Sequence, residues 1–222
     1  MFLLSPPGYC KRSSPNIKMW RSRKQQARAL GDFFADTHFT AIHASDLKRA
    51  FTTAQALYDG QKDPKPSFDS SELLREQNFG VAEGKPWTFQ ADEALTLEEH
   101  MAKGVYPVLY DDDEKFPEGE SAKDLDERAR TALEKFALPH VSQAAKEGKT
   151  GIHIAIVSHG LCISALISEL LKMSAKQSGA TNYRGLWNTA WTRVVVDIEV
   201  GSRETMIVRE LTSQRDPRKA NQ

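Results

Sequence analysis

The stretch Ile152-His153-Ile154-Ala155-Ile156-Val157-Ser158-His159-Gly160 is an apolar run that ends in a polar turn. The residues that follow, Leu161 to Met173, place apolar side chains at helical spacing. A near-continuous run of mostly β-branched residues is typical of a parallel strand that is buried on both faces. A strand, a glycine turn and a helix predict half of a βαβ unit, with the turn at the carboxyl end of the sheet. There the N–H groups of the helix can bind an anion.

The chain has 222 residues, of which 40% are apolar and 27% charged, and this fits a single α/β domain with a buried core. Its longest apolar run is interrupted by Ser158, His159 and Ser164, so we expect no membrane association. The two cysteines, Cys10 and Cys162, argue against a disulfide framework and a zinc cluster. So few cysteines fit a reducing compartment, and we expect a cytoplasmic protein.

The first 31 residues carry seven basic and no acidic side chains, whereas the remaining 191 carry 23 basic and 30 acidic ones. We interpret residues 1–22 as an irregular, basic N-terminal arm. A mitochondrial transit peptide is the alternative, but Pro6, Pro7 and Pro15 oppose the amphipathic helix that such a peptide requires. No basic face on a folded element is evident, and we therefore expect no nucleic-acid partner.

Helical and strand-like segments alternate from Arg23 onward, which predicts a layered α/β fold with a largely parallel sheet. We expect Ser45 and Ser121 to cap helices, and Gly60 and Gly148 to end them. The domain is expected to cover residues 23–212, with an insertion at 85–118 and a polar tail at 213–222. Helices are predicted from residue 23, at 45–58, at 95–101, at 121–146 with a break near Pro139, and at 161–173; strands are predicted at 39–44, 152–157, 189–200 and 205–211.

Three loops at the carboxyl ends of the predicted strands carry unusual polar groups and should converge on one crevice. Arg49, in the first turns of a helix, offers a bidentate fork to phosphate oxygens, the alternative being an exposed helix arginine. His159 can donate to a phosphate oxygen, or its ring can be held by backbone groups. Glu76, in an apolar-flanked loop, can act as a general acid if desolvation raises its pKa; its alternative is a surface ion pair with Arg75.

Four pieces follow one another over roughly residues 24–211: Ser45–Ala50 with Thr53-Ala54, Leu74-Arg75-Glu76 with Phe79-Gly80 and Glu83-Gly84, Gly119-Glu120-Ser121, and Val157-Ser158-His159-Gly160. Taken in chain order, these pieces resemble the histidine phosphatase superfamily, also called the phosphoglycerate mutase-like family. The resemblance implies an α/β three-layer sandwich with a mixed, mostly parallel sheet. It also implies phosphomonoester hydrolysis or phosphoryl transfer through a phosphohistidine, with no metal and no other cofactor. By resemblance, Arg49, His159 and Gly160 bind and polarise the phosphoryl group, and Glu76 protonates the leaving oxygen.

The family's nucleophile is a histidine in an Arg-His-Gly motif at the end of the first strand, and this motif does not occur here. Gln26-Ala27 resembles the family's Gln-Ala pair, and counting back from it places the nucleophile at or just before Met1. We therefore expect the first strand and its histidine to be absent or replaced. None of the six histidines lies in an Arg-His-Gly context: His38, His43, His100, His140, His153 and His159.

Losing about five buried side chains of such a strand costs on the order of 10 kcal/mol, which rivals the stability of a typical domain. Either Met1–Leu4 partly fills the position of the strand, or the chain is a truncated or alternatively spliced product. His43 is a candidate replacement nucleophile, although a packing role is favoured for it.

Three hypotheses about function stay open. The first is a phosphatase-like enzyme domain that is inactive or very weak because its nucleophile is missing. The second is a non-catalytic module that keeps a phosphate pocket formed by Arg49 and His159. The third is a module that binds a partner through the basic residues 1–28. The expected ligand is a small phosphorylated metabolite of open identity, and the oligomeric state is open too. Residues 85–118 are expected to form a lid, with Trp87, Phe89, Tyr106 and Tyr110 as candidate wall residues.

Overall fold

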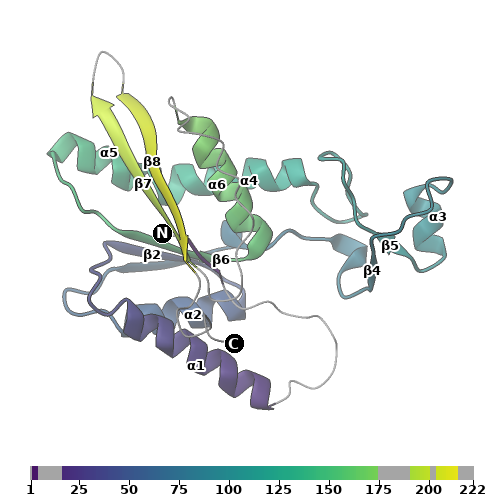
Figure 1. The fold of residues 1–222 in the computed structure, drawn as a ribbon, viewed down its shortest axis with the longest axis horizontal. Helices are drawn as coiled ribbons and strands as arrows, with labels where there is room; N and C mark the ends of the chain where they lie inside the picture. The colour runs from purple at the N-terminus through teal and green to yellow at the C-terminus, as the bar shows by residue number, and fades with distance from the viewer. Residues whose placement is uncertain (1, 5–16, 175–190, 201–203, 215–222) are drawn as a thin grey trace.

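A six-stranded mixed sheet forms the centre of the protein (Figure 1). The computed structural model describes residues 2–4, 17–174, 191–200 and 204–214. Strand order is β3-β2-β6-β1-β7-β8, in which the first four strands are parallel and β7 is antiparallel to both of its neighbours, β1 and β8. This confirms the mostly parallel sheet with a hairpin at one edge. The strands are β1 (Phe2–Leu4), β2 (Ala41–Ser45), β3 (Ser67–Ser71), β6 (Ile154–Ser158), β7 (Trp191–Val200) and β8 (Glu204–Gln214).

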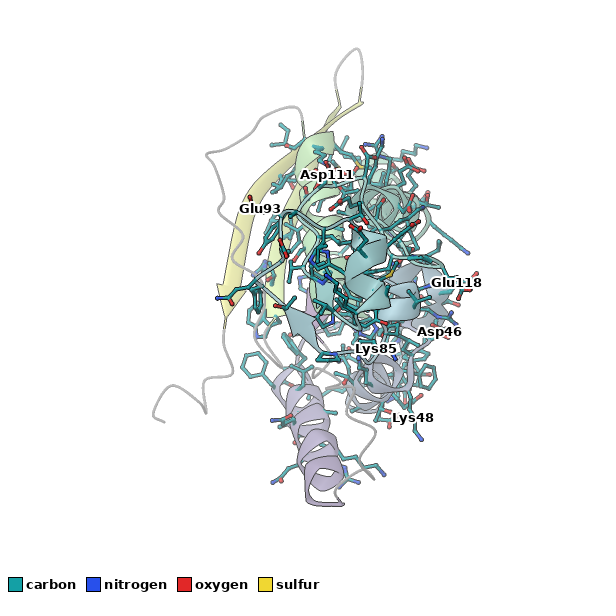
Figure 2. All side chains as sticks on the ribbon, turned by 90° about the vertical axis from the view of Figure 1, so that its right-hand side faces the viewer. Asp46, Lys48, Lys85, Glu93, Asp111 and Glu118 are labelled. Atoms are coloured by element: carbon teal, nitrogen blue, oxygen red, sulfur yellow. The ribbon has the colours of Figure 1, made fainter. Side chains whose placement is uncertain are left out.

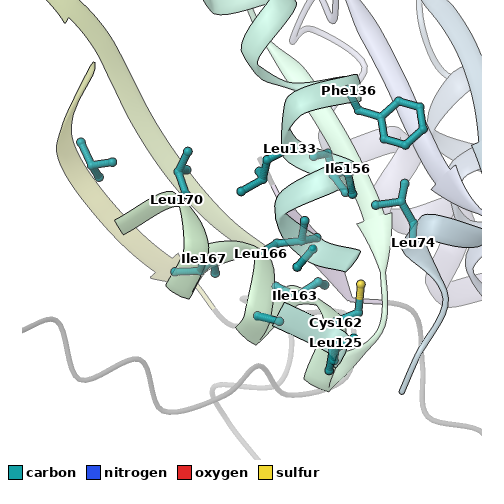
Figure 3. Packing of buried hydrophobic residues seen from close by; sticks show 14 residues of the cluster. Leu74, Leu125, Leu133, Phe136, Ile156, Cys162, Ile163, Leu166, Ile167 and Leu170 are labelled. Carbon is teal, nitrogen blue, oxygen red and sulfur yellow. The ribbon is translucent and has the colours of Figure 1, made fainter. Parts of the chain in front are cut away.

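Helices cover both faces of the sheet and complete a three-layer sandwich (Figure 1). On one face lie α1 (Ile17–Phe33) and α2 (Lys48–Asp59); on the other lie α4 (Ala122–Phe136), α5 (Leu138–Glu147) and α6 (Gly160–Met173). Two buried apolar clusters correspond to these two layers. Figure 3 shows the cluster of the α4 and α6 layer, where Leu133 and Leu166 are fully buried. Burying one such side chain stabilises the fold by roughly 1.5–3 kcal/mol.

Alternation along the central strands explains why β6 reads as a continuous apolar run. Successive strand residues point to opposite faces. Ile156 of β6 belongs to the cluster under α4 and α6, whereas its neighbours Ala155 and Val157 belong to the cluster over α1 and α2. Both sets must be apolar because both faces of the sheet are covered.

A three-residue strand, β1, occupies the middle of the sheet between β6 and β7. It runs parallel to β6, with Phe2 opposite Ile156 and Leu4 opposite Ser158, and antiparallel to β7, with Phe2 opposite Thr192. The segment Phe2–Leu4 therefore occupies a central position in the sheet. Its carboxyl end adjoins the end of β6, where the Ser-His-Gly turn begins.

Several expected boundaries need correction. The helix expected from Arg23 begins at Ile17, so the irregular arm does not extend to residue 22; after Pro15 the chain holds no proline or glycine until Gly31. Residues 5–16 of the expected arm lie outside the described residues. The polar tail expected from 213 starts later, because β8 extends to Gln214, which pairs with Trp191. Residues 215–222 of that tail also lie outside the described residues.

Capping predictions succeed at three positions and fail at one. Ser121 caps α4 in a capping box with Asp124, Gly60 ends α2, and Gly148 ends α5 in the left-handed conformation with φ of 61°. Ser45 does not cap α2, whose N-cap is Leu47. It is instead the last residue of β2, because its side chain is buried at the sheet edge.

The insertion at 85–118 extends to one side of the sandwich (Figure 1). It contains β4 (Trp87–Thr88), α3 (Leu97–Ala102) and β5 (Tyr106–Pro107), with β4 and β5 paired in parallel. Trp87 and Tyr106 pack against Phe116, with ring centroids 5.5 and 5.9 Å apart. Phe89 and Tyr110 are 81% and 78% exposed, so two of the four candidate wall residues face solvent, whereas the other two make aromatic contacts within the insertion. Its role as a lid stays a prediction.

None of the described helices combines the length and the apolar character needed to cross a membrane.

Candidate active site

Two parallel strands bring Ser45, Arg49 and His159 together. β2 and β6 are paired, with Ala44 opposite Val157, so their carboxyl ends lie at the same edge of the sheet. Arg49 Nε donates to His159 Nδ1 at 2.8 Å, and His159 Nε2 lies 2.9 Å from Ser45 Oγ. Because arginine is a donor only, Nδ1 must be the acceptor, which assigns the imidazole proton to Nε2 and makes Ser45 Oγ its acceptor.

His159 is a neutral, buried histidine. Its side chain is 1% exposed. The pKa of His159 is lowered to about 3, mainly by burial and also by the positive charges of Arg49 and Arg128, while the negative charge of Asp46 raises it by a smaller amount. The ring therefore stays uncharged near neutral pH. Both ring nitrogens contact side chains, those of Arg49 and Ser45.

Glu76 joins this group from a different loop, just after the short 3₁₀ helix η1 (Glu72–Leu74). Its Oε1 accepts hydrogen bonds from the backbone N–H groups of Leu161 at 3.0 Å, Cys162 at 3.1 Å and Gln77 at 3.3 Å. Burial raises the pKa of Glu76, and it outweighs the three N–H donors and the charge of Arg49, which lower it. A raised pKa is what a general acid requires.

At the N-terminus of α6, where the sequence predicts an anion, the structure has the carboxyl group of Glu76. Leu161 and Cys162 are in the first turn of α6, and both direct their N–H groups at Glu76. The positive end of the helix dipole and the donors favour a negative charge there. Gly160, a predicted phosphate-binding residue, is the first residue of that helix.

Arg75 does not pair with Glu76, so the alternative of a surface ion pair between them is wrong. Its guanidinium instead forms a bidentate pair with Asp46, with Nε 2.7 Å from Oδ1 and Nη2 2.5 Å from Oδ2. The pair joins the loop that carries Glu76 to the start of the α2 region. Figure 2 looks at the molecule from the insertion side, where Asp46 and Lys48 are labelled together with Lys85, Glu93, Asp111 and Glu118.

Arg128 was not singled out by the sequence, yet it holds the Glu76 loop in place. Its Nε and Nη2 donate to the two carboxylate oxygens of Glu120 at 2.7 and 2.8 Å. Its remaining donors reach the backbone oxygens of Leu73 and Arg75 at 2.9 Å and of Glu76 at 3.2 Å. In the sequence, Arg128 is marked only by its position next to Leu125 and Ala129 on the helical pattern, because these two residues lie on the buried face of α4.

The loop between Glu76 and Glu120 depends on a glycine. Gly80 has φ of +55°, and a Cβ atom there would lie 2.0 Å from the backbone oxygen of Pro117. Only glycine fits, because it tolerates both the left-handed conformation and the close approach. This accounts physically for the Phe79-Gly80 part of the resemblance.

Two other candidates for chemistry have structural surroundings. His43 is 5% exposed, with its ring 4.8 Å from that of Phe136 and 5.9 Å from that of His140. Burial is the main cause that lowers the pKa of His43 to about 4. Cys162 is fully buried, and burial raises the pKa of its thiol to about 11, which disfavours the nucleophilic thiolate. Over the described ranges, no group of three or more histidine, cysteine and carboxylate side chains is arranged to hold a metal ion.

Comparison with known proteins gives matches to one family. The profile of the histidine phosphatase superfamily (branch 1) matches residues 14–205. The probable phosphoglycerate mutase GpmB of Erwinia tasmaniensis is 30% identical over 158 residues, which is 68% of this chain and 62% of that protein. The uncharacterized phosphatase PhoE of Bacillus subtilis is 31% identical over 155 residues, 70% of this chain and 65% of that protein. The chain therefore spans less than two thirds of the length of these relatives.

The fold also matches a solved structure. A mycobacterial glucosyl-3-phosphoglycerate phosphatase in complex with inorganic phosphate superimposes with a TM-score of 0.63, over 94% of this chain and 94% of that chain, at 20% identity. The expected phosphoglycerate mutase-like architecture is confirmed by this likeness.

Proposed function

Because this chain belongs to the histidine phosphatase superfamily, we propose that it binds the phosphoryl group of a small phosphorylated metabolite beside Arg49 and His159. The observation that carries the proposal is the contact between the Arg49 guanidinium and a buried, neutral histidine, next to a carboxyl group of raised pKa. A guanidinium is suited to phosphate because its donors match two oxygens at once.

Arg49 and His159 orient each other for this role. The 2.8 Å contact with His159 uses the Nε donor of Arg49 and fixes the plane of the guanidinium. A neutral His159 adds no second positive charge, so binding strength comes chiefly from the arginine. The two side chains are positioned before a ligand arrives, which reduces the cost of ordering them on binding.

Glu76 is proposed to protonate the leaving oxygen. Three N–H groups hold its Oε1, which fixes the direction of the carboxyl group. Its raised pKa increases the protonated fraction available for transfer near neutral pH. The charge of Arg49 opposes this shift, so a bound phosphate that neutralises Arg49 will raise the pKa of Glu76 further.

The nucleophile is the part of the family mechanism that we propose is missing. Leu4, the last residue of β1, lies opposite Ser158 at the site edge. The resemblance places Arg-His-Gly at the end of this strand, but the residues after Leu4 are Ser5-Pro6-Pro7-Gly8. Loss of the nucleophile reduces turnover by roughly 10⁶-fold in the serine protease subtilisin. We therefore expect turnover of phosphomonoesters by this chain to be very weak or absent.

A non-catalytic phosphate-binding module is the second candidate, favoured by the same observations: Arg49, His159 and Glu76 are assembled although no Arg-His-Gly motif is present. Hydrolysis and binding are separable by experiment. Binding of inorganic phosphate or vanadate is measured by titration calorimetry for the wild type, for Arg49→Ala and for Lys62→Ala, an exposed control far from the site. We expect binding that only Arg49→Ala abolishes; no heat at millimolar ligand contradicts the phosphate pocket.

Turnover is tested with p-nitrophenyl phosphate and by trapping of a phosphoenzyme. The expected result is no burst and no acid-labile phosphate on the protein. Robust turnover that disappears in His43→Gln identifies a replacement nucleophile and overturns the inactive reading. Turnover that survives His43→Gln but is lost in His159→Gln likewise overturns the inactive reading, without identifying the nucleophile, because His159 is proposed to bind the phosphoryl group.

A further inference from the structure

Two leucines are exposed beside the candidate active site. Leu161 is 44% exposed and Leu47 is 36% exposed, and among the leucines of residues 24–174 only these two are exposed. Both are bonded to the site through their backbones: Leu161 N–H donates to Glu76 Oε1 at 3.0 Å, and Leu47 N–H donates to Ser45 Oγ at 3.2 Å. A single exposed leucine is ordinary on a protein surface. Because both adjoin one site, they point to a ligand that covers apolar surface there.

Leu161 lies where the organic part of a phosphomonoester would leave the site. Glu76 must come within roughly 3 Å of the ester oxygen to protonate it. The first carbon of the organic group is bonded to that same oxygen. Since Leu161 N is 3.0 Å from Oε1 of the carboxyl group, the leucine and the organic group lie within a few ångströms of the same carboxyl. Leu161 is therefore placed to pack against the organic group.

Leu47 borders the site on the side of the buried histidine. The Ser45 hydroxyl that accepts from Leu47 N–H also lies 2.9 Å from His159 Nε2. Leu47 is the N-cap of α2, and Arg49 is the second residue of that helix. The two exposed leucines thus stand at the starts of α2 and α6, the two helices that begin at the site.

Two guanidinium groups near Glu76 are already paired. Arg75 forms its bidentate pair with Asp46, and Arg128 donates to a second carboxylate and to three backbone oxygens. A ligand with a carboxylate or a second phosphate next to the ester oxygen would have to break one of these pairs or leave its own charge unpaired. An uncharged apolar group meets neither cost. Lys48, exposed at the start of α2, is the competing cation and has its own arm in the experiment.

We propose that the site selects phosphomonoesters whose organic group is apolar and uncharged next to the ester oxygen, such as an aryl or alkyl group, and that Leu161 and Leu47 determine this selectivity by contacting that group. The inference rests on the proposed function, because it requires the phosphoryl group beside Arg49. Selectivity is a difference between two affinities. Here the leucines favour the apolar group, and the cost of breaking an ion pair disfavours a charged one.

The experiment measures binding by titration calorimetry, with inorganic phosphate, phenylphosphonate and phosphonoacetate as probes. Phosphonates resist hydrolysis, so affinity is measured whether or not the chain turns over esters. The test variants are Leu161→Asn and Leu47→Asn, because asparagine has the branching of leucine with polar ends. Asparagine is also a favoured N-cap, so Leu47→Asn should fold even if Leu161→Asn does not. Leu161→Met keeps an apolar side chain and is the matched control.

The quantity compared is the ratio of the phosphate Kd to the phenylphosphonate Kd within each variant. We expect this ratio to be about ten in the wild type, with phosphonoacetate bound more weakly than phenylphosphonate. Leu161→Asn and Leu47→Asn should each lower the ratio about threefold or more, whereas Leu161→Met should keep it. Arg49→Ala should abolish the binding of all three probes.

The outcomes separate this inference from the proposed function. Phosphate binding with a ratio of one or less overturns the inference and leaves the phosphate pocket intact. Folded Leu161→Asn and Leu47→Asn variants that both keep the wild-type ratio also overturn it. If the wild type binds no phosphate, the proposed function fails and the inference fails with it.

Two further results would contradict the apolar selectivity. Tighter binding of phosphonoacetate than of phenylphosphonate assigns a charged ligand to the site, and its loss in Lys48→Ala identifies Lys48 as the partner of the carboxylate. Binding of phenylphosphonate that survives Arg49→Ala takes place away from the site.

Discussion

Replacing Arg128 by methionine removes a hydrogen-bond centre that joins three parts of the chain. The guanidinium donates five hydrogen bonds, two to Glu120 and one each to the backbone oxygens of Leu73, Arg75 and Glu76. Methionine keeps much of the apolar stem but donates none of these bonds. The loop that carries Glu76 then loses its connection to α4.

The expected loss follows from burial. The side chains of Arg128 and Glu120 are only 15% and 24% exposed. Breaking a fully buried ion pair from one side costs about 3–5 kcal/mol, because the remaining charge is left without a partner. Some water reaches both groups here and can replace part of the interaction. We therefore expect Arg128→Met to lower the free energy of unfolding by about 3 kcal/mol.

Urea unfolding at pH 7, followed by circular dichroism, measures this loss. Glu120→Gln and the double variant Arg128→Met/Glu120→Gln complete a double-mutant cycle, and Lys62→Met serves as an exposed control. The double variant should cost less than the sum of the single ones, with a coupling of at least about 1 kcal/mol. A loss below about 0.5 kcal/mol for Arg128→Met, or no coupling with Glu120, would refute the reasoning.

Three further predictions concern buried groups. The pKa of His43 is about 4 in the folded chain and about 6.5 when unfolded, so stability present above pH 6.5 is lost as pH falls toward 4, by up to about 1.4 kcal/mol per pH unit. His43→Leu should therefore make the urea midpoint depend less on pH between pH 7 and 4.5, and an unchanged pH dependence contradicts this. Glu76→Ala removes a hydrogen-bond acceptor at the start of α6 and should lower the free energy of unfolding in urea by about 1 kcal/mol, whereas Glu76→Gln keeps an oxygen there and should lower it less. A larger loss for Glu76→Gln than for Glu76→Ala counts against the capping role. Cys162 should resist iodoacetamide at pH 8 in the folded chain and react in urea, as followed by peptide mass spectrometry, because burial holds its thiol neutral; rapid alkylation without urea contradicts its burial.

The features that depend on a few neighbouring residues were predictable. The β6–α6 unit was expected from an apolar run, a glycine turn and helical spacing. The capping box at Ser121 and the left-handed Gly148 followed from side chains within three residues of the helix ends. Such features arise from local hydrogen bonds and local backbone preferences, so nearby sequence is sufficient to specify them.

Ser45 shows where local reasoning fails. A serine before an apolar helical pattern fits an N-cap, but Ser45 is the last residue of β2 and bonds to His159, 114 residues away. Tertiary packing decided between two locally acceptable roles. The same holds for Arg75, whose carboxylate partner is Asp46 and not its neighbour Glu76.

The sequence by itself determined the residue types of the candidate site and their order, because phosphate chemistry needs an arginine, a histidine and a carboxyl group at strand ends. Only the tertiary structure decided how these groups act on one another. Burial keeps His159 neutral and raises the pKa of Glu76, and both effects depend on what the folded layers exclude from water. The structure also placed Phe2–Leu4 in the centre of the sheet, since strand order is set by long-range pairing that short segments do not encode.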